Sequence, residues 1–85
     1  MDTFTFINDP GHGWVRVPWT ALKDVGLNPQ DFSRYSYRSG NIFYLEEDCD
    51  APKFIAAYTA KHKSGPILVD KYVARFNRSL PSIHS

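Results

Sequence analysis

The sequence contains a single cysteine, Cys49, and lacks several other features that would narrow its function. One cysteine cannot form an internal disulfide, so nothing here demands an oxidising compartment. No apolar run approaches the length of a membrane span. Residues 1–10 also lack the basic start and apolar core of a signal peptide. We therefore expect a cytoplasmic protein that does not enter a membrane.

A strong excess of either charge is also missing. The formal net charge is +1, which removes the usual argument for a strongly basic nucleic-acid-binding protein. Residues 1–50 nevertheless hold eight acids and four bases, whereas residues 51–85 hold one acid and six bases. This asymmetry suits an acidic or a basic contact patch, but charges scattered over a solvated surface would produce the same count.

Aromatic residues are plentiful by comparison. They make up 15% of the 85 residues, and hydrophobic residues make up 42%, which is typical of a chain that folds around a core. The length predicts one small domain over residues 1–85. Residues 77–85 contain Pro81 and three serines, and we expect them to form a mobile tail.

A hairpin over residues 34–47 organises the rest of the prediction. Aromatic and branched residues flank Gly40 and Asn41, which tolerate the positive φ of a tight two-residue turn. The opposed pairs would be Arg38 with Phe43, Tyr37 with Tyr44, Ser36 with Leu45, Tyr35 with Glu46 and Arg34 with Glu47. Because side chains alternate between faces, Phe43 and Leu45 share one face and Tyr37 and Tyr44 the other.

Two strands and a helix are predicted before the hairpin. Residues 4–7 are β-prone and end at a turn signal, and residues 11–18 alternate until Pro18 stops the strand. Pro18 also suits the first turn of a helix, whose apolar stripe continues to Val25. Gly26 then provides the stop.

A second helix and a last strand are predicted after the hairpin. The helix runs from about Ala51 to Lys63, with Asp50 as its N-cap. Residues 66–76 suit either a strand or a helix, and we favour the strand. The order strand, strand, helix, strand, strand, helix, strand predicts an α+β domain. Its small antiparallel sheet would carry both helices on one face.

Few residues point to chemistry. Cys49 lies near a predicted helix start, where the dipole favours a thiolate, but neighbouring carboxylates act against it. His12, His62 and His84 are not placed beside it by the sequence. The acidic run 46–50 lacks the spacing of a calcium loop, and the scattered histidines lack that of a zinc site. We expect no catalytic activity, metal or cofactor.

Tyrosines give the sharper hypothesis. Those of the hairpin would gather on the face away from the helices, and tyrosine with arginine commonly anchors protein interfaces. The same rings could instead pack beneath the C-terminal segment, and stacking of single-stranded bases is a third reading that the low charge weakens. Secondary contacts would come from a histidine between two glycines and from the acidic run. The predicted partner-binding residues are Tyr35, Tyr37, Arg38, Tyr44, His12, Glu46, Glu47 and Asp48.

Four motifs carry a resemblance. They are Gly11-His12-Gly13-Trp14-x-x-Val17-Pro18, Leu22-x-x-Val25-Gly26-Leu27, Tyr35-Ser36-Tyr37 and Tyr44-Leu45-Glu46-Glu47-Asp48-Cys49-Asp50. Over residues 9–58 the chain resembles small uncharacterised proteins carried by tailed phages and other mobile elements. The resemblance implies a bacterial cytoplasm and no known activity. It implies a stoichiometric binder of a bacterial host protein or defence complex, in its sharpest form an anti-CRISPR-like inhibitor.

A second resemblance covers residues 13–46. Gly13-x-Val15-x-Val17-Pro18-x-x-x-Leu22-x-x-Val25-Gly26-Leu27-x-Pro29-x-Asp31, followed by the glycine-centred hairpin, is similar to AbrB-type regulators and MazE-type antitoxins. Those proteins are swapped-hairpin dimers that bind DNA. The resemblance implies, as the alternative function, a homodimeric DNA-binding regulator using Arg16, Lys23, Arg34 and Arg38. Trp19 and a second helix depart from that pattern.

Overall fold

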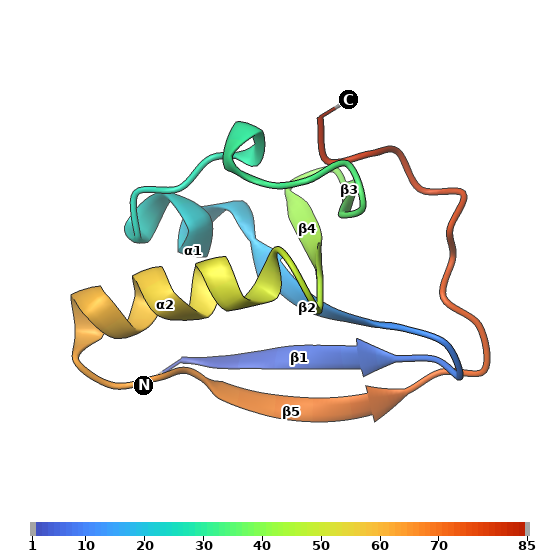
Figure 1. The fold of residues 1–85 in the computed structure, drawn as a ribbon, viewed down its shortest axis with the longest axis horizontal. Coiled ribbons are helices and arrows are strands. Elements are labelled where there is room, and N and C mark those ends of the chain that lie inside the picture. The colour runs from blue at the N-terminus through green and yellow to red at the C-terminus, as the bar shows by residue number, and fades with distance from the viewer. Residues whose placement is uncertain (1, 85) are drawn as a thin grey trace.

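The structure is a computed structural model, which describes residues 2–84, and it contains five strands, two α-helices and one 3₁₀-helix (Figure 1). The elements are β1 (Thr3–Asn8), β2 (Gly13–Pro18), α1 (Trp19–Asp24), the 3₁₀-helix η1 (Pro29–Asp31), β3 (Tyr37–Ser39), β4 (Ile42–Glu46), α2 (Ala51–His62) and β5 (Ile67–Tyr72). The α+β class and the predicted order of strands and α-helices are confirmed. Within the described residues, neither α-helix has the length and apolar character that crossing a membrane requires.

The strands form one sheet in the order β3-β4-β2-β1-β5. Neighbouring strands are antiparallel except for the last pair, because β5 runs parallel to β1 with Thr3 opposite Ile67 and Asn8 opposite Tyr72. The expectation of a wholly antiparallel sheet is therefore wrong at this edge. The physical reason is the crossover: β4 and β1 point the same way, and α2 returns the chain to the end of the sheet where both begin.

Alternation along the central strands decides which face the helices cover. Val15 and Val17 of β2 oppose Leu45 and Phe43 of β4, so these four side chains share one face. The core gathers on that face and includes Leu22 of α1 and both Phe54 and Tyr58 of α2. Its buried members are Phe4, Val15, Val17, Leu22, Phe32, Phe43, Leu45, Ala51, Phe54, Tyr58 and Ile83.

The predicted hairpin is correct at its turn and wrong further from it. Gly40 has a φ of 59°, Tyr37 opposes Tyr44, and Arg38 opposes Phe43. The three outer pairs do not form, because β3 begins only at Tyr37. Ser36 is buried instead, and its hydroxyl accepts the backbone N–H of Glu46 at 2.9 Å.

Residues 73–84, which we call the C-terminal strap, fold back across the molecule toward β3 (Figure 1). The N–H of Ile83 donates to the carbonyl of Ser36 at 3.0 Å, and the N–H of Arg38 donates to that of Pro81 at 3.0 Å. Ile83 is 0% exposed. This packed arrangement differs from the mobile tail expected over residues 77–85, because one isolated apolar residue reaches the core. Ser85 lies outside the described residues.

Replacing Ile83 with alanine tests whether the strap belongs to the folded domain. Ile83→Ala should lower the free energy of unfolding by about 2–5 kcal/mol, because it removes buried apolar volume and leaves a cavity. Urea denaturation of the full chain measures this loss, with Arg75→Ala on the exposed part of the strap as control. A loss below about 0.5 kcal/mol, the range of ordinary surface substitutions, would mean that the strap does not pack as described.

Candidate functional site

Residues from five separate segments meet at a shallow pocket of about 360 Å³. They come from the turn between β1 and β2, from β2 itself, from the hairpin and the loop before it, from the acidic turn after β4, and from the strap. We call it the aromatic–acidic pocket, and it is lined by His12, Trp14, Tyr35, Tyr37, Glu46, Asp48, Cys49 and Arg78.

Five of the eight residues predicted to bind a partner lie in this pocket: His12, Tyr35, Tyr37, Glu46 and Asp48. Four of them belong to the hairpin and its flanks, and His12 is distant in the sequence. The sheet brings His12 to the others because β2, which follows it, lies beside β4, and β4 lies beside β3. Tyr35 is 59% exposed, and His12 and Asp48 are exposed as well. The predicted residues therefore make one surface, apart from three that the structure places elsewhere.

Arg38, Tyr44 and Glu47 do not line the pocket. Arg38 lies on the helix-covered side of the sheet, where its guanidinium carbon is 5.1 Å from the centroid of the Phe43 ring. The ring of Tyr44 contacts that of Phe76 in the strap, with centroids 5.3 Å apart. The ring of Tyr37 also contacts Phe76, with centroids 5.7 Å apart. The expectation that the hairpin tyrosines stand open to solvent is thus wrong for Tyr37 and Tyr44, which are both half-buried, and correct for Tyr35.

Trp14 forms the floor of the pocket and was missed as a site residue. Its ring is 3% exposed and stacks on Phe76 with centroids 4.0 Å apart and an interplanar angle of 15°. The Arg78 guanidinium lies 5.4 Å from its centroid, a cation–π arrangement. Alternation along β2 places Trp14 on the face opposite Val15, which was the available signal. No signal in the sequence pointed to Arg78.

The buried carboxylate of Asp50 fixes the loop that carries Tyr35. Asp50 is 2% exposed, and its two oxygens accept the backbone N–H of Ser33 at 3.0 and 3.1 Å. The hydroxyl of Ser33 donates to it at 2.7 Å, and that of Ser36 donates as well. Asp50 does occupy the N-cap position of α2, as predicted, but its side chain makes no capping hydrogen bond there.

Glu46 orders the acidic turn. Its carboxylate accepts the backbone N–H groups of Asp48 and Cys49 at 2.9 and 2.8 Å. The carboxylate of Asp48 is exposed and has no hydrogen-bond or ion-pair partner among residues 2–84. One acidic side chain therefore builds the turn, and the next one is presented to solvent at the pocket.

The chemistry of Cys49 weighs against a nucleophile. Partial desolvation, together with the charges of Glu46, Asp50 and Asp48, raises the pKa of the thiol, so the thiolate fraction at neutral pH is small. His12 lines the same pocket as Cys49, but no hydrogen bond joins the two side chains among the described residues. Within residues 2–84, no three His, Cys, Asp or Glu side chains gather closely enough to hold a metal ion.

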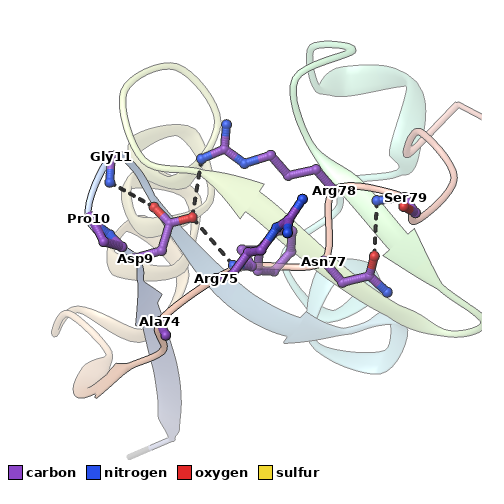
Figure 2. Close-up of a pocket in the computed structure, with 9 residues that line it drawn as sticks. Asp9, Pro10, Gly11, Ala74, Arg75, Asn77, Arg78 and Ser79 are labelled. Atoms are coloured by element: carbon purple, nitrogen blue, oxygen red, sulfur yellow. Dashed lines mark hydrogen bonds and ion pairs between the residues drawn. The ribbon is translucent and has the colours of Figure 1, made fainter.

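Asp9 joins the turn between β1 and β2 to the strap (Figure 2). Its carboxylate accepts the N–H groups of Gly11 and His12 at 2.9 and 2.8 Å and the Arg78 guanidinium at 3.1 Å. These donors, the His12 N–H foremost, lower the pKa of Asp9 to about 2. An open hollow of about 650 Å³ lies beside this contact. Because Asp9 and Arg78 already satisfy each other there, the hollow offers a ligand less than the aromatic–acidic pocket does.

The arginines of the alternative DNA-binding function do not share a surface. Arg16 opposes Tyr44, whereas Arg38 opposes Phe43, so the two point to opposite faces of the sheet. Arg34 lies beside Tyr35, with its guanidinium carbon 5.8 Å from the ring centroid. The Lys23 ammonium is 5.9 Å from the Trp19 ring on α1. These four basic side chains therefore do not form one continuous basic face.

Removing the Asp50 carboxylate should loosen the Tyr35 loop and destabilise the fold. We expect Asp50→Ala to lower the free energy of unfolding by about 2–3 kcal/mol, because the buried hydroxyl of Ser36 and the Ser33 N–H lose their acceptor. Asp48→Ala removes an exposed carboxylate two residues away and should change the free energy of unfolding by less than about 0.5 kcal/mol. Chemical denaturation compares the two variants, and equal losses would contradict the role given to Asp50.

Asp9 should contribute to stability in a defined pH range. Its pKa is about 2 in the folded chain and 3.8 ordinarily, so folding favours the ionised form. The contribution is complete above about pH 5 and fades as pH falls through 3.8 toward 2. The stability difference between the native chain and Asp9→Asn should therefore be larger at pH 6 than at pH 3 in urea titrations. Asp70→Asn on β5 is the control, and a pH-independent difference for Asp9→Asn would contradict the contact.

Comparison of the chain with models of known families, with curated proteins and with solved structures finds no match. The two resemblances described for the sequence therefore stay predictions.

Proposed function

We propose that this protein is a non-enzymatic binding domain that acts by stoichiometric contact with a bacterial host protein, through the aromatic–acidic pocket. The observation that carries the proposal is Tyr35, a ring 59% exposed on a loop that the buried Asp50 carboxylate holds in place. Exposed aromatic anchors dominate the binding energy of many interfaces. A loop that is ordered before binding loses little entropy when the complex forms.

The composition of the pocket supports the same proposal. Buried Trp14 and half-buried Tyr37 form an aromatic centre, while His12 and Asp48 are exposed at its edge. An aromatic centre inside a polar rim is the usual anatomy of a protein interface. The raised pKa of the Cys49 thiol favours binding over nucleophilic catalysis as the use of this pocket.

The resemblance to phage and mobile-element proteins supplies the setting of the proposal. The motifs Gly11–Trp14, Tyr35–Tyr37 and Tyr44–Asp50 that carry it also supply seven of the eight pocket residues. In this proposal the protein acts in the cytoplasm of a bacterial host and binds a host-defence complex. The most specific version is that it inhibits a CRISPR effector, as anti-CRISPR proteins do. The opposite orientations of Arg16 and Arg38 make the DNA-binding regulator the weaker alternative.

Site-specific photocrosslinking in host cells tests the proposal. A benzoylphenylalanine in place of Tyr35 should yield one discrete crosslinked species of fixed mass, because a specific partner meets that loop in one orientation. The matched control places the same group at Tyr72, which is 65% exposed on β5 and lies outside the pocket. Binding through the pocket would be contradicted if position 35 gave no crosslinked product, or if positions 35 and 72 gave the same products.

A further inference from the structure

The charges around the aromatic–acidic pocket favour a cation. Glu46 and Asp48 line it, and Asp48 has no ionic partner within residues 2–84. The one guanidinium among the lining residues belongs to Arg78, and the Asp9 carboxylate lies 3.1 Å from it. Unpaired negative charge therefore remains at the rim next to Asp48. This negative charge would repel an anion that enters the pocket, and a neutral group would leave the Asp48 carboxylate unpaired.

The aromatic walls suit the same kind of group. The faces of tyrosine and tryptophan rings attract cations through their quadrupoles, and arginine is the side chain most often found on them. Two arginines of this chain already lie this way, with guanidinium carbons 5.4 Å from the Trp14 centroid and 5.8 Å from that of Tyr35. The pocket volume of about 360 Å³ lies at the lower end of the range of about 300–1,000 Å³ that is typical of pockets for small molecules.

Resting on the proposed function, we propose that the pocket receives an arginine side chain from the host protein. Its guanidinium lies against Tyr35 and Tyr37 and donates to the Asp48 carboxylate. A planar guanidinium meets both requirements, because it stacks on rings and pairs with a carboxylate through two parallel N–H groups. A lysine ammonium pairs with Asp48 as a point charge and stacks less well, so arginine is the preferred occupant.

A titration with a single capped residue tests this assignment. N-acetyl-arginine methylamide is added to the full ¹⁵N-labelled chain, and the two indole N–H signals are followed. The Trp14 signal and the amides of Tyr35 and Tyr37 should shift in a saturable way, while Trp19, which does not line the pocket, should not. The citrulline analogue has the same shape without the charge, and it should bind at least about fivefold more weakly because it cannot form an ion pair with Asp48.

Matched variants locate the contact. Asp48→Asn keeps the size of an exposed side chain and should weaken arginine binding about fivefold to tenfold, whereas Asp70→Asn on β5 should leave it unchanged. Equal binding of arginine and citrulline would overturn the inference. So would a Trp14 signal that does not move, or unchanged affinity in Asp48→Asn.

The two proposals fail in different ways. A discrete crosslink from position 35 combined with a failed arginine titration overturns the assigned occupant and leaves binding to a host protein supported. Saturable arginine binding without any crosslink from position 35 overturns the proposed function and leaves the ligand class of the pocket supported.

Discussion

The buried carboxylate of Asp50 is the interaction on which the candidate site depends. A carboxylate in a protein interior is unfavourable unless several donors meet it. Here Ser33 and Ser36 provide those donors through one backbone N–H and two hydroxyls. Asp50 also precedes the first turn of α2, whose Phe54 and Tyr58 are buried in the core. The loop carrying Tyr35 is consequently fixed to the core although it has no regular secondary structure.

The strap completes the site from the other side. Phe76 stacks on Trp14, and Arg78 joins Asp9 at the turn before β2. The sheet is thus covered by helices on one face and partly by the strap on the other. The aromatic–acidic pocket lies where the strap, this turn and the acidic turn after β4 meet. Its walls come from segments that are held separately, which favours a preformed binding surface over one that orders on contact.

Local rules in the sequence predicted most of the fold. Gly40 and Asn41 gave the hairpin turn, and alternation in β2 and β4 gave the buried face. Three features depended on contacts between distant residues and were not predictable in this way. Ser36 left the hairpin ladder to bind a residue 14 positions away, Ile83 reached the core from a polar segment, and the direction of β5 followed from the crossover through α2.

The site was predicted in part for the same reason. Residue type alone pointed to Tyr35, Tyr37 and the acidic run, because aromatic and charged groups are common at interfaces. It could not separate Tyr35, which is exposed, from Tyr37 and Tyr44, which are half-buried, because the contacts of the last two with Phe76 come from the strap. Trp14 looked like an ordinary strand residue until Phe76 and Arg78 were placed around it.

Hydrogen exchange at the Ser33 amide tests the central claim most directly. That N–H lies on a loop outside the regular elements and donates to both oxygens of Asp50. If Asp50 fixes the loop, the amide should be strongly protected in the native chain, with exchange close to that of core amides. Exchange at the rate of an unstructured peptide would show that the loop opens freely, and a preformed site around Tyr35 would be contradicted.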